Sequence, residues 1–259
     1  MAVKTGYWNI RGYMQPIRLL LAYAGVEYED KRYNVGPAPD YDRSEWLNDK
    51  FNLGLDFPNC PYYVDGDVKI SQTFAILKYL GRKHNLAAKT EEEQIRVDLM
   101  EAEAIDMRTK WSTLCYNADF EKMKPDYIKN VAVKLKEVST FLGSHPYFAG
   151  QNITYIDFVI YELLDQNSQL IPGLLVEFPN LKEYQARIGG LEKVAAYLSS
   201  DKFIKYPFNG PSAHGAENKL NGGNHYNHIC KFNLVFICLA IRKKNVGYYK
   251  SYSIFRVNG

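Results

Sequence analysis

The sequence predicts a small α/β domain followed by an all-helical domain. Strand-like and helix-like patterns alternate between residues 5 and 84, whereas residues 90–200 carry apolar side chains at helical spacing without a strand-like run. The chain has 259 residues, room for one large or two ordinary domains, and its 46% hydrophobic content is enough to form a core. We expect an α/β domain over residues 1–84, a linker over 85–89, a helical domain over 90–220 and an atypical tail over 221–259.

The α/β half begins with a strand that ends near Tyr7 and leads through a turn into a helix. Pro16 suits the first turn of that helix and Gly25 suits its end. The residues that repeat between them at helical spacing are Ile17, Leu20, Leu21 and Ala24. The next predicted elements are a strand over residues 28–33, a proline-containing loop over 36–42 and a short helix over 44–51.

A hairpin and a helix complete this half. Asp65-Gly66-Asp67 separates two short apolar runs, which predicts a tight turn between two antiparallel strands. A helix is predicted from Gln72 to His84, and the side chains expected to face inward are Ala75, Ile76, Tyr79 and Leu80. A βαβ unit followed by a hairpin and a helix predicts a mixed sheet rather than a fully parallel one.

Two capping motifs mark helix starts in the second half. Thr90 is followed three residues later by Glu93, the spacing of a capping box at the start of a long helix. Thr154 and Asp157 have the same spacing, and Ile153 can pack against the first turns of that helix.

The tail over residues 221–259 differs from the rest of the chain. It is rich in Asn and Tyr and contains an apolar run over residues 234–241, followed by three basic residues. One interpretation is a membrane anchor, and the other is a poorly ordered or non-native extension. A bilayer-spanning helix needs about 20 apolar residues, so the second interpretation is favoured and no membrane association is expected.

Composition excludes several classes of function. A net charge of +3, with basic residues dispersed among acidic ones, does not indicate a nucleic-acid-binding protein. The four cysteines and five histidines show no metal-binding spacing, so no metal is expected. Free thiols and the lack of an apolar N-terminal segment predict a cytoplasmic protein.

Candidate binding residues lie where the predicted strands end. A tyrosine at the carboxyl end of a strand, here Tyr7, can donate a hydrogen bond to an anionic ligand, although such a residue can also be simple core packing. If the Cys60–Pro61 bond is cis, the backbone of Cys60 is exposed to pair with an extended peptide. The helix that starts at Thr73 offers free amides to a carboxylate. A second anion site is predicted at Arg43, Trp46 and Lys50, so the groove suits a short peptide with a carboxylate at each end.

Several long motifs closely resemble the mu class of glutathione S-transferases. These are residues 6–12 (GYWNIRG), 38–47 (APDYDRSEWL), 53–59 (LGLDFPN), 114–117 (LCYN) and 148–158 (FAGQNITYIDF). The resemblance extends from about residue 5 to about residue 209. The motif sequences look most similar to those of arachnid members from ticks and mites, some of which are allergens.

The resemblance implies a thioredoxin-like N-terminal domain that binds glutathione and an all-α C-terminal domain that binds the electrophile. Tyr7 would stabilise the glutathione thiolate by a hydrogen bond, and the thiolate would attack a hydrophobic electrophile in a detoxification reaction. Glutathione is a co-substrate in this reaction, and no cofactor is implied. Lowering a thiol pKa by about two units requires roughly 2.7 kcal/mol, and a hydrogen bond to a charged acceptor is worth about 1.5–3 kcal/mol.

The same resemblance assigns the other residues by position. The glutathione-binding set would be Tyr7, Trp8, Arg43, Trp46, Lys50, Asn59, Cys60, Gln72 and Thr73, with Asp106 contributed by a partner subunit. The electrophile-binding set would be Ile10, Tyr13, Ile105, Arg108, Ser112 and Tyr116. Phe57, in an Asp-Phe-Pro loop, would insert between helices of the partner in a homodimer, or would otherwise pack under its own loop.

Some positions depart from the mu pattern. Thr73 stands where Ser is usual, Cys60 where Leu is usual and Ser112 at a commonly apolar position, so the preferred electrophile is uncertain from the motif alone. Cys60 is expected to be a small buried side chain, with oxidation or a mixed disulfide as the alternative. Two other functions stay open: a ligandin-type protein that binds hydrophobic compounds without catalysis, and a structural protein that has lost glutathione binding, as some lens crystallins have.

Overall fold

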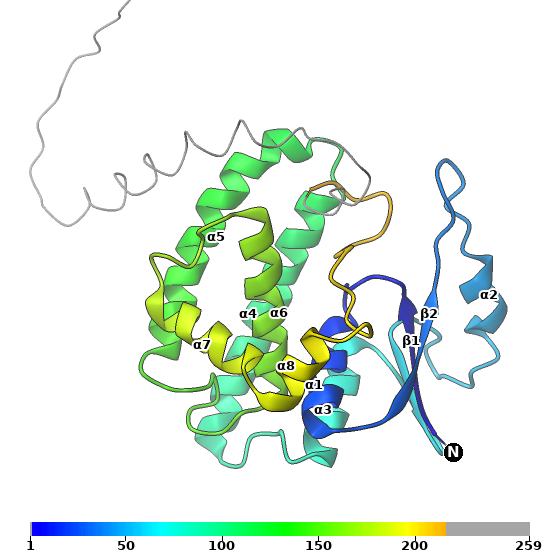
Figure 1. Ribbon diagram of the computed structural model, residues 1–259, viewed down its shortest axis with the longest axis horizontal. Helices are drawn as coiled ribbons and strands as arrows, with labels where there is room; N and C mark the ends of the chain where they lie inside the picture. The colour runs from blue at the N-terminus through cyan, green and yellow to red at the C-terminus, as the bar shows by residue number, and fades with distance from the viewer. Residues whose placement is uncertain (1, 216–259) are drawn as a thin grey trace, which may run out of the picture. The chain divides into compact units, whose positions relative to one another are not determined.

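The computed structural model describes residues 2–215 (Figure 1). Within that range a four-stranded sheet and three helices come first, and five further helices follow. The predicted tail, including its apolar run over residues 234–241, lies outside the described residues. Among the residues described, no helix combines the length and apolar character that crossing a membrane requires.

The sheet is mixed, as predicted. β1 (Val3–Trp8) and β2 (Tyr28–Tyr33) run parallel and are joined by α1 (Gln15–Ala24), which serves as the crossover helix. β3 (Tyr62–Asp65) and β4 (Val68–Ser71) form the expected hairpin, and β3 pairs antiparallel with β1. The strand order is β2-β1-β3-β4, so β1 is a central strand and its carboxyl end lies in the middle of one sheet edge.

The helices of this half begin and end close to the predicted positions. Gly25 closes α1 in the left-handed conformation at φ 71°, a region that favours glycine. α2 spans Ser44–Lys50 and α3 spans Thr73–Lys83. The expectation that Ala75 faces inward is wrong: Ala75 is exposed and Leu77 is buried, because the core-facing stripe of α3 runs through Leu77 and its neighbours.

The second half is helical throughout the described range. Its helices are α4 (Glu91–Cys115), α5 (Phe120–Leu142), α6 (Tyr155–Leu170), α7 (Pro179–Gly189) and α8 (Glu192–Leu198). The Thr90 hydroxyl accepts the Glu93 N–H at 3.2 Å, and the Asp157 carboxylate accepts the Thr154 N–H at 2.8 Å. Both predicted helix starts are therefore confirmed.

One apolar core connects the two halves. Side chains of α1, α3 and α6, among them Leu20, Ile76 and Ile160, belong to a single buried cluster. A buried ion pair adds to this junction: the Nε of Arg11 donates to the Glu162 carboxylate at 3.0 Å, and Asp165 accepts from the same guanidinium at 2.6 Å. The loop that carries Arg11 follows β1, so α6 supports the loop in which the candidate site lies.

Candidate glutathione and electrophile site

Tyr7 lies near the carboxyl end of β1 and is only 5% exposed. Its hydroxyl oxygen accepts the backbone N–H of Tyr13 at 3.2 Å. The hydroxyl proton has no acceptor among residues 2–215. The geometry therefore leaves one hydrogen-bond donor available at the edge of the sheet.

Gly12 allows the loop to close against this tyrosine. Its φ is +47°, in the left-handed region, and an added Cβ would lie 2.6 Å from the Tyr7 hydroxyl oxygen and 2.5 Å from a ring carbon. A side chain here would push the ring or the loop away, and the Tyr13 N–H would move with it.

The protonation state of Tyr7 follows from its burial. Removal from water raises the pKa of Tyr7 to about 12, although the Tyr13 N–H and the nearby Arg108 cation act in the opposite direction. The phenol is therefore neutral near pH 7 and can act only as a hydrogen-bond donor or acceptor, because a general base must first lose its proton.

α2 places an aromatic and a basic side chain beside this edge of the sheet. Trp46 is 5% exposed and stacks on Tyr62, with ring centroids 6.1 Å apart. Tyr33 also contacts Trp46, at 5.3 Å between centroids, and its hydroxyl donates to Asp49 at 2.8 Å. These contacts hold α2 against the sheet. Lys50 ends α2, with its Nζ 5.1 Å from the ring of Phe51.

Other groups of the predicted site are more exposed. Trp8 is half-buried and meets the Tyr33 ring edge-on at 6.4 Å. Arg43 is exposed at the position before α2. The rings of Trp8 and Trp46 therefore both lie against Tyr33, and Arg43 lies at the start of α2.

The segment before β3 carries a cis Cys60–Pro61 peptide bond, as expected. The N–H of Cys60 donates to the side-chain oxygen of Asn59 at 2.9 Å. Cys60 is half-buried rather than fully buried as expected. This burial still raises the pKa of its thiol to about 12, an effect that Lys50 partly offsets. The thiol is therefore protonated at neutral pH, and the alternative of an oxidation-prone Cys60 is disfavoured.

The start of α3 brings Gln72 and Thr73 to the same edge. Gln72 has φ 74°, a conformation that costs energy for any residue except glycine and that marks strained functional positions. Its side chain is exposed, and the Thr73 hydroxyl donates to the carbonyl of Tyr13 at 3.4 Å. The α3 N-terminus is thus linked to the same loop that contacts the Tyr7 hydroxyl.

Arg108 and Tyr13 form a polar wall beside this loop. The guanidinium carbon of Arg108 lies 4.6 Å from the centroid of the Tyr13 ring, which is 41% exposed. Its Nη1 donates to the side-chain oxygen of Gln166 at 2.6 Å. The Nε of Arg108 and the Nε2 of Gln166 are buried and have no partner in the described part of the chain. Gln166 was not assigned to the site from the sequence. The one sequence feature that could have indicated it is a polar residue within the apolar stripe of the helix predicted from residue 155.

The remaining predicted electrophile residues differ in their exposure. Ile10 is buried, Ser112 is half-buried, and Ile105 is 44% exposed. Tyr116, which follows α4, is 48% exposed, and its hydroxyl accepts the Gly210 N–H at 2.7 Å.

The segment over residues 206–210, which sequence reasoning did not assign to the site, covers the loop after β1. The N–H groups of Arg11 and Gly12 donate to the carbonyls of Pro207 and Phe208, both at 2.9 Å. The indole N–H of Trp111 donates to Asn209 at 3.3 Å. No local sequence signal predicts these contacts, since they join residues that are 98 or 196 positions apart.

Two predicted residues stand apart from this group. Phe57 is 75% exposed and Asp106 is exposed on α4. Phe57 does not pack under its own loop, which removes the alternative considered for it. Among the described residues, no group of His, Cys, Asp and Glu side chains could hold a metal ion.

Both halves of this chain match the sequence models of known protein domains. The sequence model of the glutathione S-transferase N-terminal domain matches residues 3–82, and that of the glutathione S-transferase C-terminal domain matches residues 105–201. The chain therefore belongs to the glutathione S-transferase family, whose thioredoxin-like and all-α domains were predicted. It is a transferase that conjugates glutathione to electrophilic compounds.

Curated relatives define the class more closely. Glutathione S-transferase Mu 6 of Mus musculus is 54% identical and Mu 2 of Rattus norvegicus is 53% identical, each over 207 residues that cover 80% of this chain and 95% of the relative. The chain is therefore a mu-class member, as its motifs predicted.

Solved structures agree with the glutathione S-transferase fold. The glutathione S-transferase Blo t 8 has a TM-score of 0.75 at 32% identity and covers 81% of this chain and 98% of that one. The pi-class glutathione S-transferase of Onchocerca volvulus has a TM-score of 0.73 at 29% identity, with 83% and 100% covered.

Proposed function

We propose that Tyr7 donates its hydroxyl proton in a hydrogen bond to the glutathione sulfur and so holds it as a thiolate for attack on a hydrophobic electrophile. The observation that carries this proposal is the Tyr7 O–H, which is buried, protonated at neutral pH and without an acceptor among the described residues. A neutral donor lowers the thiol pKa without removing a proton itself, so no general base is needed.

The rest of the glutathione site is proposed from position and exposure. The set is Trp8, Arg43, Trp46, Lys50, Asn59, Cys60, Gln72 and Thr73, with Asp106 supplied by the partner subunit. Arg43 and Lys50 would neutralise the glycyl carboxylate, and the α3 N-terminus would bind the γ-glutamyl carboxylate. The Cys60 N–H would exchange its hydrogen bond with Asn59 for one to the peptide backbone.

The electrophile would lie against Ile10, Tyr13, Ile105, Arg108, Ser112 and Tyr116. The two unpaired buried donors on Arg108 and Gln166 favour an electrophile with an oxygen acceptor, such as a nitroarene or an unsaturated carbonyl compound. An oxygen that gains negative charge during attack would then face a guanidinium rather than apolar carbon.

We propose a homodimer in which Phe57 inserts between helices of the partner, since a 75% exposed phenylalanine is unfavourable in water. The proposed location is the cytosol. We also propose that the chain resembles arachnid (tick and mite) mu-class members, a finer assignment that rests on its motifs. The proposed domains are an α/β domain over residues 1–84 and a helical domain over residues 90–220, joined by a linker over residues 85–89. A tail over residues 221–259 follows the helical domain.

Purification on immobilised glutathione, followed by an assay with a chloronitrobenzene, tests the proposal. Retention and turnover are the expected results. Retention without turnover across several electrophiles would favour a ligandin-type binding protein instead. Failure to bind the resin would favour a structural protein that has lost glutathione binding.

Subunit complementation tests the role of Asp106. A hybrid of one Tyr7→Phe subunit and one Asp106→Ala subunit retains one complete site only if Asp106 acts across the interface. The expected result is therefore a hybrid with about half of the parental kcat/KM at neutral pH and low glutathione concentration. A hybrid with only the low kcat/KM of the two single variants would place Asp106 in the site of its own chain.

A further inference from the structure

α2 packs on the face of the sheet opposite α1 and α3 (Figure 1). Neighbouring residues of a strand point to opposite faces. Along β3, Tyr63 therefore packs against Tyr79 of α3, whereas Tyr62 packs against α2. α2 has seven residues, and Trp46 is the one that is buried. The position of α2 thus depends on a small number of contacts.

A small core lies between α2 and the sheet. Its buried side chains are Tyr33, Trp46, Leu55 and Tyr62. None of them belongs to the larger buried cluster that connects the two halves of the chain. The side chains that hold α2 are therefore distinct from those of the main core.

A chain of three polar groups runs through this small core. The Tyr33 hydroxyl donates to the Asp49 carboxylate at 2.8 Å, and the hydroxyl oxygens of Tyr33 and Tyr62 are 3.0 Å apart. Tyr33 has one hydroxyl proton, which Asp49 accepts, so Tyr62 donates to Tyr33. The two tyrosines are 0% and 4% exposed, so water cannot readily replace a lost partner.

Gly6 makes room for this chain of hydrogen bonds in the central strand. β1 lies between β2, which carries Tyr33, and β3, which carries Tyr62, and Gly6 pairs with Tyr62. An added Cβ on Gly6 would lie 2.1 Å from a ring carbon of Tyr62 and 2.5 Å from its hydroxyl oxygen. The Tyr62 ring therefore lies directly over Gly6, where any larger residue would block its path to Tyr33.

Asp49 provides the buried polar attachment of α2. It lies in the last turn of the helix, where the backbone dipole does not favour a negative charge. At the other end of α2, Glu45 accepts the Asn34 N–H at 2.9 Å and lies 3.7 Å from the Lys31 ammonium, and these contacts are exposed. Exposed ion pairs contribute little to stability. The hydrogen bond from Tyr33 is therefore the stronger polar restraint on α2.

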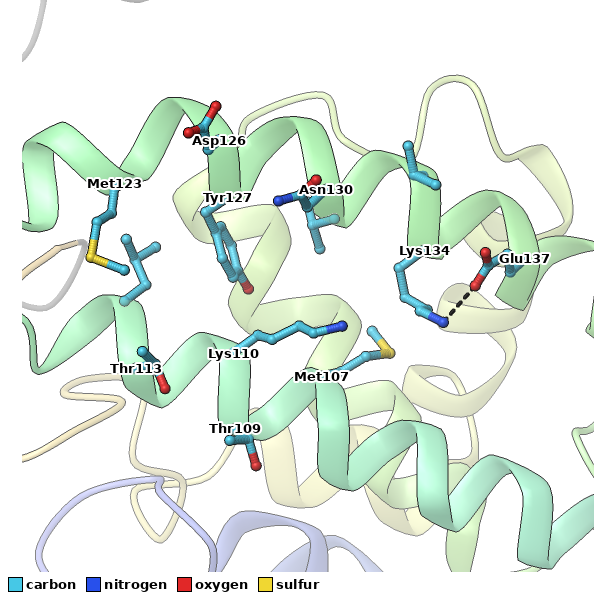
Figure 2. Close-up of a pocket in the computed structure, with 13 residues that line it drawn as sticks. Met107, Thr109, Lys110, Thr113, Met123, Asp126, Tyr127, Asn130, Lys134 and Glu137 are labelled. Atoms are coloured by element: carbon cyan, nitrogen blue, oxygen red, sulfur yellow. Dashed lines mark ion pairs between the residues drawn. The ribbon is translucent and has the colours of Figure 1, made fainter.

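A cavity of about 540 Å³ between α4 and α5 takes no part in this arrangement (Figure 2). All of its lining residues fall within residues 107–137, so none belongs to α2 or to the sheet. Substitutions in the small core therefore do not alter the walls of this cavity.

We propose that Asp49 and Tyr33 are positioning residues, which fix α2 for the glycyl end of glutathione and so determine the preference for this tripeptide over γ-glutamylcysteine, which lacks the glycine. Lys50 follows Asp49 directly, and Trp46 stacks on Tyr62, so both ligand-binding side chains move with α2. This inference rests on the proposed function, in which side chains of α2 bind the glycyl half of glutathione.

Conjugation of a chloronitrobenzene with each of the two thiols tests the inference. Tyr33→Phe removes the hydroxyl and keeps the ring. The KM for glutathione should rise about five- to tenfold, because a hydrogen bond to a charged group is lost and part of its energy reaches the ligand. The kcat at saturating glutathione should change less than about twofold, since Tyr7 is untouched. With γ-glutamylcysteine, kcat/KM should also change less than about twofold, so the preference for glutathione falls.

Tyr63→Phe is the matched control. It removes the hydroxyl of an equally buried tyrosine, which donates to Asp65 at 3.2 Å on the other face of the sheet, and it should leave both KM values unchanged. Asp49→Ala should reproduce the effect of Tyr33→Phe, and the double variant should be no worse than either, because both remove one contact. Asp49→Asn keeps an acceptor oxygen and should raise the glutathione KM less than Asp49→Ala does.

Two results would overturn the inference while the parental protein remains active. The first is an equal loss of kcat/KM with both thiols in Tyr33→Phe and Asp49→Ala, which would indicate general damage to the fold. The second is a glutathione KM in both variants that matches that of Tyr63→Phe. A parental protein that does not conjugate glutathione would instead refute the proposed function, and this inference with it. Thermal unfolding checks that each variant is folded at the assay temperature.

Discussion

Replacing Tyr7 with phenylalanine removes the hydroxyl and keeps the ring. A hydrogen bond to a charged acceptor is worth about 1.5–3 kcal/mol, and one pKa unit corresponds to about 1.36 kcal/mol. The pKa of bound glutathione should therefore rise by about one to two units. Because Tyr7 is only 5% exposed, water cannot readily replace the lost donor. At neutral pH, kcat/KM should fall about 10- to 100-fold, and the difference should narrow at alkaline pH, where the thiol ionises unaided.

The assay is chloronitrobenzene conjugation as a function of pH, together with thermal unfolding. The Tyr13 N–H loses its acceptor in the variant, so a loss of stability of about 1–2 kcal/mol is also expected. Tyr23→Phe, on α1, is the matched control and should leave the pH profile unchanged. An unchanged thiol pKa and full neutral-pH activity in Tyr7→Phe would refute the hydrogen-bond role of Tyr7.

The pKa of about 12 for that tyrosine predicts the shape of the parental pH profile. Ionisation removes the donor only as the pH approaches 12, so kcat/KM should rise with thiol ionisation and show no fall up to about pH 10; a fall beginning near pH 8 would contradict the assignment. Gly12→Ala should reduce activity about tenfold or more, because the added Cβ meets the Tyr7 ring. Gly66→Ala is the control, because Gly66 also has a positive φ but nothing lies within reach of an added Cβ, and it should leave activity unchanged. Glu162→Gln weakens the partner of the buried Arg11 guanidinium and should lower the free energy of unfolding by about 3 kcal/mol. Lys4→Met, which breaks an exposed ion pair, should lower it by less than about 1 kcal/mol. Equal losses of stability in denaturant titrations would contradict the structural role of the buried pair. Cys60 should alkylate slowly with iodoacetamide at neutral pH in the folded protein and rapidly after denaturation, as peptide mass spectrometry can measure; rapid labelling in the folded state would show that burial does not protect it.

The fold was largely predictable because its signals are local. Gly66 in the hairpin, Gly25 at the end of α1 and the Thr90 cap each act on backbone groups within a few residues. Ala75 was assigned incorrectly because helical spacing alone does not say which part of a wide apolar stripe meets the core.

The site was predictable only in part. Residues at strand ends and helix starts, such as Tyr7 and Thr73, follow from the order of the elements. Gln166 and the segment over residues 206–210 were missed, because they reach the site from distant parts of the chain. Their roles depend on packing that no local pattern records.

The sequence by itself determined the order of strands and helices, the tyrosine at the end of the first strand and the class of transferase to which the chain belongs. Tertiary structure decided the properties that depend on burial: Tyr7 is a neutral donor and Cys60 is a protonated thiol. It also decided that Arg108 pairs with Gln166 and that a separate cavity opens between α4 and α5. The physical reason is one of distance along the chain. Turns and caps depend on neighbouring residues, whereas desolvation, pKa and cavities depend on groups that folding brings together from far apart.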